Sequence, residues 1–204
     1  MNETSKKLSE KLKQFSTPEL CDGGAEGVMD YTIKPFVSSG RIAGPAYTVN
    51  VPENISGIVP DAFADIRPGE VLVIAGNGCC KGSYWGDYRS LCAKKLGVEA
   101  VIIDGAFRDY DECKHIGIPI FAKGIIPHSA GKDRIGELQT PVICGGVTVN
   151  PGDIIVADAN GVLVIPPQEA DAIMEGAQRK KDAEARTLQK MEETNVIIPR
   201  VVLS

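Results

Sequence analysis

Apolar and polar residues alternate in blocks that divide the first half of the chain into strands and helices. Short apolar runs rich in β-branched residues predict extended or buried strands over residues 42–51, 70–75, 100–103 and 119–122. Helices are predicted in between, over 87–96 and 109–115, and Gly97 is a suitable stop residue for the first of them. This alternation of strand and helix is typical of α/β proteins.

Further helices are predicted toward both ends of the chain. Residues 3–14 form an amphipathic pattern, and Ser16 followed by Pro18 predicts a capped second helix. A third helix is predicted over 55–64, and a long charged one over about 167–193. The apolar tail after it suits a strand or a contact with a partner subunit.

The second half contains short strands at close intervals, predicted over 142–143, 147–149, 154–157 and 162–165. Turn signals separate them at Pro151-Gly152-Asp153 and Asn160-Gly161. The glycine-rich segment 76–86 is predicted to be a loop. Because no linker interrupts the chain, we expect one domain over residues 1–204, an α/β sandwich with a mixed sheet.

Composition narrows the range of functions. The chain has 204 residues and a formal net charge of −5, whereas nucleic-acid binders are usually basic. It has neither a long apolar run nor an apolar core near its start, so we expect a cytoplasmic protein without a membrane span. None of the six cysteines forms a CxxC pair, which favours reduced thiols over a zinc site. Cys79 and Cys80 are adjacent within a glycine-rich segment, so reactive thiols there stay an alternative.

The strand–helix–strand unit over 70–112 is predicted to bring polar residues to one edge of the sheet. The helix of such a unit runs antiparallel to its strands, so it begins above their carboxyl ends. A helix of about ten residues spans about 15 Å, close to the length of a short strand. Asp87 should therefore meet Arg108 and Asp109 at the edge where α/β proteins usually bind ligands.

These residue types suit an anion, and a 2-oxo acid in particular. The Arg108 guanidinium matches a carboxylate, and the helix start offers free backbone N–H groups. The anion would meet the first residues of that helix: Gly86, Asp87, Tyr88 and Arg89.

A divalent metal is the expected cofactor. Asp109 and Glu112 lie one helical turn apart and offer the oxygen ligands that Mg²⁺ or Mn²⁺ prefers. Asp87 could hold a metal-bound water or move a proton. The metal would chelate the carboxylate and keto oxygens and stabilise an enolate as a C–C bond breaks.

Two plainer interpretations stay open at this point. An arginine and an aspartate next to each other at a strand end are most often a surface ion pair, worth about 0–1 kcal/mol. Asp104-Gly105 and the glycine-rich segment could both be simple turns.

Several segments together resemble the 4-hydroxy-4-methyl-2-oxoglutarate aldolase family, which shares its fold with the regulator of ribonuclease activity A. Gly86-Asp87 and Arg108-Asp109-x-x-Glu112 have the family spacing, with twenty residues in between. The supporting segments are IAGPAYTV (42–49), RPGEVLVI (67–74), VIIDGAFRD (101–109), PIFAKG (119–124) and VNPGDIIVADANGVLVIP (149–166). The resemblance covers roughly residues 17–190.

The resemblance implies roles for the same residues. Arg108 matches the arginine that grips the pyruvyl carboxylate, and Asp109 matches the direct metal ligand. Asp87 matches the acid that holds metal-bound water, and the Gly86–Arg89 backbone matches the substrate loop. Glu112 fills an acidic position that ribonuclease-regulating members tend to lack, which favours catalysis.

The resemblance also implies a swivelling-type α/β/β fold, a homotrimer or hexamer, and an active site near a subunit interface. The implied activity is metal-dependent (class II) retro-aldol release of pyruvate from a 4-hydroxy-2-oxo acid, with oxaloacetate decarboxylation as a side activity. A neighbouring subunit can add an acid, for which Glu192 and Glu193 are candidates.

Two rival enzyme functions rest on weaker features. A Schiff-base aldolase would use Lys81, Lys94 or Lys95, but such a lysine is normally buried, and the last two suit a solvated helix face. A methyltransferase would need a nucleotide-binding glycine loop, and the glycine that follows Gly78 falls too far along the chain, at Gly82.

Two further rivals belong to other classes. A swivelling phosphohistidine domain would need a histidine after the Gly145-Gly146 turn, whereas the two histidines are His115 and His128. The main rival is a non-catalytic regulator that inhibits an RNA-processing enzyme through its acidic surface.

Overall fold

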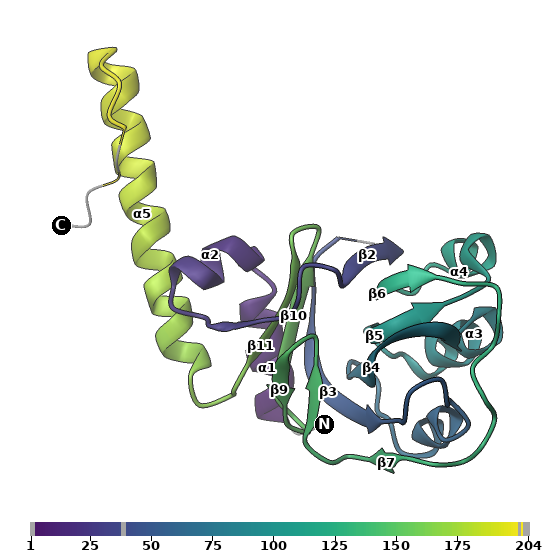
Figure 1. Cartoon of the computed structure of the whole chain (residues 1–204). Helices are drawn as coiled ribbons and strands as arrows, with labels where there is room; N and C mark the ends of the chain where they lie inside the picture. Colours follow the sequence, from purple (N-terminus) through teal and green to yellow (C-terminus); the bar gives the residue numbers. More distant parts are fainter. Residues whose placement is uncertain (1–2, 38–39, 200, 202–204) are drawn as a thin grey trace.

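The computed structural model describes residues 3–37, 40–199 and 201 (Figure 1). One large mixed sheet has the order β1-β11-β10-β3-β4-β5-β6-β2, with β7 paired to β3, and β8 and β9 form a separate hairpin. The strands are β1 (Gly27–Val28), β2 (Lys34–Val37), β3 (Ile42–Asn50), β4 (Val71–Trp85), β5 (Ala100–Phe107), β6 (Ile120–Ile125), β7 (Glu137–Leu138), β8 (Val142–Cys144), β9 (Val147–Val149), β10 (Ile154–Asp158) and β11 (Gly161–Ile165). The helices are α1 (Glu3–Leu12), α2 (Thr17–Asp22), the 3₁₀ helix η1 (Val59–Ala64), α3 (Asp87–Leu96), α4 (Tyr110–Ile116) and α5 (Ala170–Thr194).

The parallel strands β3, β4, β5 and β6 form the centre of the sheet and are buried on both faces. Leu72 and Ile74 of β4 point into one apolar cluster, whereas Val71 and Val73 point into another. Continuous apolar runs are what a sheet with both faces covered requires. The predicted buried strands are therefore confirmed.

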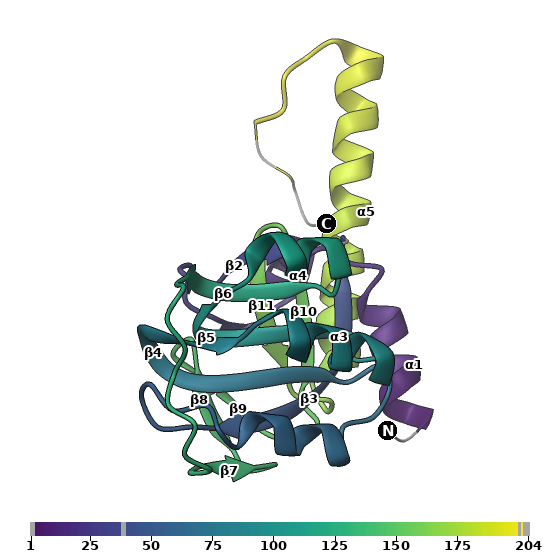
Figure 2. The same cartoon turned by 90° about the vertical axis from the view of Figure 1, so that its right-hand side faces the viewer.

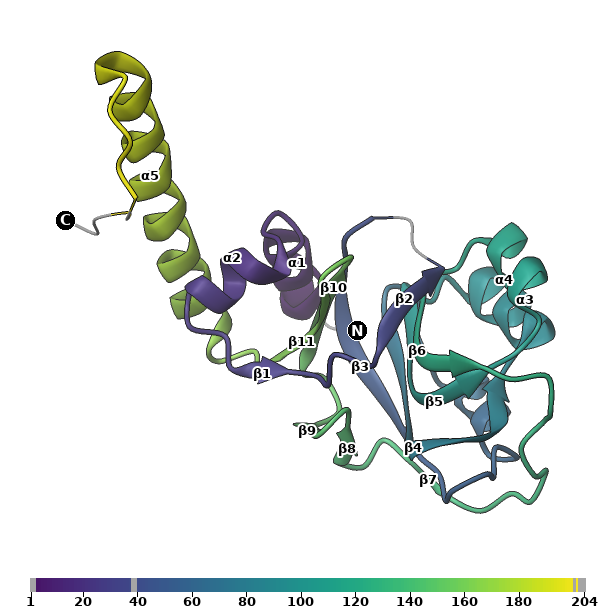
Figure 3. The same cartoon turned by 45° about the horizontal axis from the view of Figure 1, so that its top comes forward.

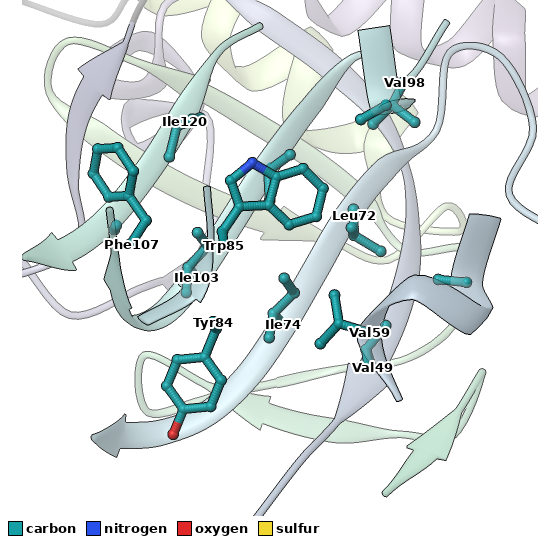
Figure 4. Close-up of a cluster of buried hydrophobic side chains, with 14 of the residues drawn as sticks. Val49, Val59, Leu72, Ile74, Tyr84, Trp85, Val98, Ile103, Phe107 and Ile120 are labelled. Carbon is teal, nitrogen blue, oxygen red and sulfur yellow. The ribbon is translucent and has the colours of Figure 1, made fainter. Parts of the chain in front are cut away.

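The molecule is built in layers, as Figures 1 and 3 show. Helices α3 and α4 cover one face of the parallel strands over a cluster that includes Leu72, Trp85 and Phe107 (Figure 4). The opposite face packs on β8 to β11. Helices α1, α2 and α5 cover the outer side of β10 and β11. The predicted α/β class with a mixed sheet and a long C-terminal helix is confirmed.

Local signals set several of the helix ends. Ser16 accepts from Glu19 N–H and the Glu19 side chain accepts from Ser16 N–H, a capping box that starts α2. Gly97 ends α3 with φ 74, a left-handed conformation that glycine adopts readily. Helix α5 projects away from the body, and the chain turns back after Asn195 without forming a strand up to residue 199 (Figure 2).

Two predictions of local structure are wrong. Residues 76–86 are not a loop, because β4 continues to Trp85 through bulges where Asn77 and Gly78 have positive φ. The predicted helix over 55–64 is reduced to η1, because Ile55 instead pairs with Gly131. The alternative of a turn at Asp104 and Gly105 is excluded as well, because both residues belong to β5.

None of the helices in the described part of the chain is both long and apolar enough to cross a membrane.

Candidate active site

Two neighbouring parallel strands deliver the predicted site residues to one edge of the sheet. Trp85 at the end of β4 pairs with Phe107 at the end of β5, and Arg108 N–H donates to Trp85 O at 3.1 Å. Helix α3 begins directly after β4, and α4 begins soon after β5. Asp87 N–H consequently lies 3.4 Å from Asp109 Oδ2, so the expected convergence of Asp87 and Asp109 is present.

Gly86 joins β4 to α3 where a side chain would not fit. A Cβ at this position would lie 2.5 Å from Asp109 Oδ2 and 3.3 Å from Arg108 Cγ. Its φ of −168° is ordinary extended backbone, so close approach and not conformation calls for glycine here.

A buried hydrogen-bonded chain fixes the two helix starts below the surface. Trp85 Nε1 donates to Ser90 Oγ at 2.7 Å, and Ser90 Oγ lies 3.4 Å from Cys113 Sγ. Cys113 Sγ in turn donates to the Arg108 carbonyl at 3.6 Å. Burial raises the pKa of the Cys113 thiol, which keeps it neutral. This series of hydrogen bonds therefore connects β4, α3 and α4 to the backbone of Arg108.

A cavity of about 180 Å³ opens above these residues, a volume suited to a small metabolite. It is lined by Ser83, Trp85, Gly86, Asp87, Tyr88, Arg89, Arg108, Asp109, Ser129 and Lys132. Three of the lining residues are cationic and two are carboxylates, so the charged groups favour an anionic ligand.

Arg108 is held by two contacts and still faces the cavity. Its Nε lies 3.1 Å from Asp109 Oδ2, and one terminal nitrogen donates to Ser129 Oγ at 2.8 Å. The second terminal nitrogen has no partner among the described residues, which leaves a donor for a ligand carboxylate.

The side chain of Arg89 is bonded to the protein backbone. Its guanidinium donates to the Tyr84 carbonyl and, at 3.1 Å, to the Ser56 carbonyl. Burial lowers the pKa of Arg89, and the nearby Arg108 lowers it further. Arg89 therefore contributes charge to the cavity wall while its donors are turned to the protein backbone.

Asp109 adopts a conformation that is uncommon for a residue with a side chain. Its φ of 58° and ψ of 47° are left-handed, and aspartate tolerates this region better than most residues. Strained backbone of this kind is frequent at functional sites. The turn directs the Asp109 carboxylate toward Asp87.

The carboxylates of Asp87 and Asp109 fit a hard divalent cation. Asp109 Oδ2 and Asp87 Oδ1 accept bonds from the protein, the latter from Tyr88 N–H at 2.6 Å, but their other oxygens have no described partner. Mg²⁺ is usually bound by one or two carboxylates and completed by water and substrate oxygens. No cluster of three or more His, Cys, Asp or Glu side chains suited to a metal occurs among the described residues.

Glu112 and Tyr88 are placed differently from the core of the site. Glu112 is exposed on α4 and does not line the cavity, so the structure does not bring it to the same point as Asp109. Tyr88 lines the mouth of the cavity with its side chain 76% exposed. Metal binding by Glu112 stays a prediction.

The features behind the rival enzyme functions lie outside the cavity. Gly76, Asn77 and Gly78 are part of β4 and form no loop between a strand and a helix. Lys81 is exposed, and Lys94 Nζ donates to the Ile116 carbonyl on the outer surface. Neither lysine lines the cavity. The six cysteines, which were predicted to be reduced, are all free thiols.

Sequence reasoning missed four cavity residues: Ser83, Trp85, Ser129 and Lys132. Ser129 and Lys132 belong to a segment, here called the strap (residues 128–133), that follows β6 and pairs in parallel with the end of β4 at Ser83. Ser83 N–H donates to His128 O at 2.8 Å, and Ala130 N–H donates to Ser83 O at 3.1 Å. No local pattern indicates this pairing, because its partners lie about forty-five residues apart in the sequence.

Comparisons with known proteins agree on one family. A model of the RraA-like family, described as Aldolase/RraA, matches residues 17–164. A protein of Halalkalibacterium halodurans named "Putative 4-hydroxy-4-methyl-2-oxoglutarate aldolase" is 38% identical over 180 residues, which are 86% of either chain.

Two of the solved structures that match are described as RraA proteins. Streptomyces coelicolor RraAS2, described as an unusual member of the RNase ES inhibitor RraA protein family, matches with a TM-score of 0.79 and 26% identity, over 90% of this chain and 98% of its own. The RNA-processing inhibitor RraA from Thermus thermophilis matches with a TM-score of 0.69 and 27% identity, over 74% and 93%. The family model and the identity to the Halalkalibacterium protein together show that this chain belongs to the RraA-like family of aldolases and RraA proteins.

Proposed function

We propose that the protein is a divalent-metal-dependent lyase that releases pyruvate from a 4-hydroxy-2-oxo acid by retro-aldol cleavage and also decarboxylates oxaloacetate. One observation carries the proposal. The same cavity is lined by Arg108, whose guanidinium keeps an unused donor, and by the carboxylates of Asp87 and Asp109, which keep unused oxygens. The name of the Halalkalibacterium relative supports the same chemistry.

Arg108, Asp109 and Asp87 each have a part in this reaction. Arg108 binds the carboxylate of the pyruvyl half and fixes its orientation. Asp109 would hold the cation directly, and the exposed Glu112 would add a ligand in an assembled protein. A bound Mg²⁺ or Mn²⁺ would supply electrostatic stabilisation of the negative charge that develops on the keto oxygen.

The protein's own groups move the proton. Asp87 takes the proton of the C4 hydroxyl while the C3–C4 bond breaks, and the electron pair of that bond passes to the pyruvyl half. Asp87 then returns the proton to C3, which gives pyruvate, and C4 leaves as a carbonyl compound. In oxaloacetate the same bond breaks with loss of carbon dioxide.

A regulator of an RNA-processing enzyme is the second candidate, because two of the matched solved structures are described as an RNA-processing inhibitor and a member of an RNase inhibitor family. Such a protein needs an exposed surface for its partner and no reactive cavity. It predicts capture of a ribonuclease and no turnover of 2-oxo acids.

A homotrimer or hexamer in the cytoplasm is the proposed state of the protein. The end of α5 projects from the body, and the large apolar residues exposed on it and on the tail are Leu188, Val196 and Ile197. These residues support a contact with another copy, which could bring Glu192 or Glu193 toward a neighbouring site. Light scattering coupled to gel filtration tests the assembly.

Pyruvate release, followed with coupled lactate dehydrogenase, tests the proposed reaction. The substrates are 4-hydroxy-4-methyl-2-oxoglutarate, 4-carboxy-4-hydroxy-2-oxoadipate and oxaloacetate, each with Mg²⁺ and with excess EDTA. We expect release with Mg²⁺ that stops in EDTA. Activity that persists in EDTA would favour a Schiff-base mechanism, and no release from any substrate would favour the regulator.

A further inference from the structure

The series of hydrogen bonds beneath the cavity can run in one direction only. Trp85 Nε1 has a proton to donate and accepts none, so Ser90 Oγ is the acceptor at 2.7 Å. The Arg108 carbonyl only accepts, so the single proton of Cys113 points to it. Ser90 must then donate its own proton to Cys113 Sγ, 3.4 Å away. The side chains of Trp85, Ser90 and Cys113 are buried, so they depend on one another for partners.

Cys113 holds both peptide groups that flank Asp109. Its thiol donates to the Arg108 carbonyl at 3.6 Å, and its backbone N–H donates to the Asp109 carbonyl at 2.8 Å. Within the described part of the chain, no other group donates a hydrogen bond to the Arg108 carbonyl. The orientations of these two peptide groups determine the φ and ψ angles of Asp109.

The backbone of Asp109 needs such contacts to keep its conformation. Its φ of 58° and ψ of 47° lie in the left-handed region, which residues with a side chain seldom adopt. Sparsely populated conformations persist where the surrounding structure holds them. In this conformation Asp109 Oδ2 lies 3.1 Å from Arg108 Nε and 3.4 Å from Asp87 N. A change to the common right-handed conformation would turn the carboxylate away from these partners.

We propose that Cys113 and Ser90 are positioning residues for the metal site, because they keep Asp109 in its left-handed conformation and its carboxylate at the cavity. Cys113 acts directly on the two peptide groups. Ser90 acts through Cys113, since its hydroxyl group orients the thiol toward the Arg108 carbonyl. This inference rests on the proposed function, because it takes Asp109 as the direct ligand of the cation.

The affinity for Mn²⁺ tests the inference without turnover. Free Mn²⁺ would be measured by electron paramagnetic resonance during titration of the wild type, Cys113→Ala, Cys113→Ser, Ser90→Ala and the double variant Ser90→Ala/Cys113→Ala. Cys144→Ala is the matched control, because it removes an equally buried thiol from the opposite face of the sheet. Urea unfolding of each variant measures the change in stability separately.

We expect Cys113→Ala to raise the dissociation constant for Mn²⁺ about fivefold, as the loss of one neutral hydrogen bond allows. Cys113→Ser should restore most of the affinity, because a hydroxyl group can still donate. Ser90→Ala should raise the dissociation constant about threefold, and the double variant no further than Cys113→Ala, because both residues act through one bond. Cys144→Ala should lose stability and keep the wild-type affinity.

The fluorescence of Trp85 tests the other end of the series, because Trp85 is the one tryptophan of the chain. Ser90→Ala should change the emission, since the indole N–H loses its acceptor. Cys144→Ala should leave the emission as it is in the wild type. Unchanged emission in Ser90→Ala would show that the series does not begin at Trp85, and would overturn the role of Ser90.

Two results for Mn²⁺ would overturn the inference, and they are distinguishable. If the wild type binds Mn²⁺ and Cys113→Ala loses no more affinity than Cys144→Ala, the positioning role is wrong while the proposed function stands. If the wild type itself does not bind Mn²⁺, Asp109 is not a metal ligand and both proposals fail.

Discussion

Strand β5 and the residues just after it carry two ion pairs that differ in what surrounds them. Asp104 pairs with Lys123 of β6 at 2.8 Å, with side chains that are 7% and 21% exposed. Four residues further along, Arg108 pairs with Asp109 at 3.1 Å, with side chains that are 42% and 29% exposed. The first pair is closed within the fold, whereas the second lines a cavity and keeps unused donors and acceptors.

The comparison separates a structural pair from a candidate functional one. A closed pair satisfies its own charges, and removing one partner leaves an uncompensated charge inside the protein. An open pair contributes little to stability but can exchange its partner for a ligand. The two pairs should therefore respond in opposite ways to substitution, one in stability and the other in activity.

Lys123→Met should give the largest effect, a loss of about 2–4 kcal/mol in the free energy of unfolding, because Asp104 would keep its charge without a partner. Urea unfolding followed by circular dichroism measures this change, with Lys11→Met as the matched control. A loss no larger than that of the control would show that the Asp104–Lys123 pair is not structural.

The same pair predicts a dependence on alkaline pH. Burial lowers the pKa of Lys123, but the hydrogen bond to Asp104 and its charge outweigh this effect, so the pKa lies above the ordinary 10.5. The stabilisation is complete below pH 10.5 and is lost as the pH rises through the raised pKa. The difference in the free energy of unfolding between the wild type and Lys123→Met should therefore decrease only at strongly alkaline pH.

Arg108→Ala should affect activity and leave stability nearly unchanged, the opposite of Lys123→Met. We expect kcat/KM for pyruvate release to fall about 10- to 100-fold, because a charge-assisted contact with the substrate is lost. The free energy of unfolding should change by less than about 1 kcal/mol, as for other exposed ion pairs. Near-normal turnover in this variant would remove Arg108 from the reaction centre.

Asp109→Asn should weaken the response to metal by about tenfold, seen as a higher Mg²⁺ concentration at half-maximal activity. Asparagine tolerates the left-handed backbone of this position, so the fold should be preserved. An unchanged Mg²⁺ titration would show that Asp109 does not hold the metal.

Gly86→Ala should have the smallest effect, a fall of about fivefold in kcat/KM, because the new methyl group must displace the Asp109 carboxylate. Gly124→Ala on β6 is the matched control, since a Cβ there meets nothing within 4 Å. Equal activity of the two variants would mean that the close contact at Gly86 is unimportant.

Local signals in the sequence predicted the parts of the fold that depend on neighbouring residues. The helix cap at Ser16 and the stop at Gly97 act within one turn of helix, and both were predicted. The meeting of Asp87 and Asp109 followed from the geometry of a crossover unit.

The remainder depends on contacts between distant segments. Residues 76–84 contain glycines that suggest a loop, but pairing with β5 and the strap keeps them in β4. Ser129 and Lys132 join the site only because the strap bonds to Ser83 and Asn54. Such tertiary hydrogen bonds override local propensity, so no pattern in the sequence indicates them.

Binding of oxalate tests the central claim most directly, because oxalate mimics the planar enolate of pyruvate and does not require the right substrate to be known. Calorimetry with the wild type should show one oxalate per chain in the presence of Mg²⁺ and none in EDTA. Arg108→Ala and Asp109→Asn should each weaken binding by about tenfold or more. Oxalate binding that is unaffected by both substitutions would contradict the account, because the 2-oxo acid site would then lie elsewhere.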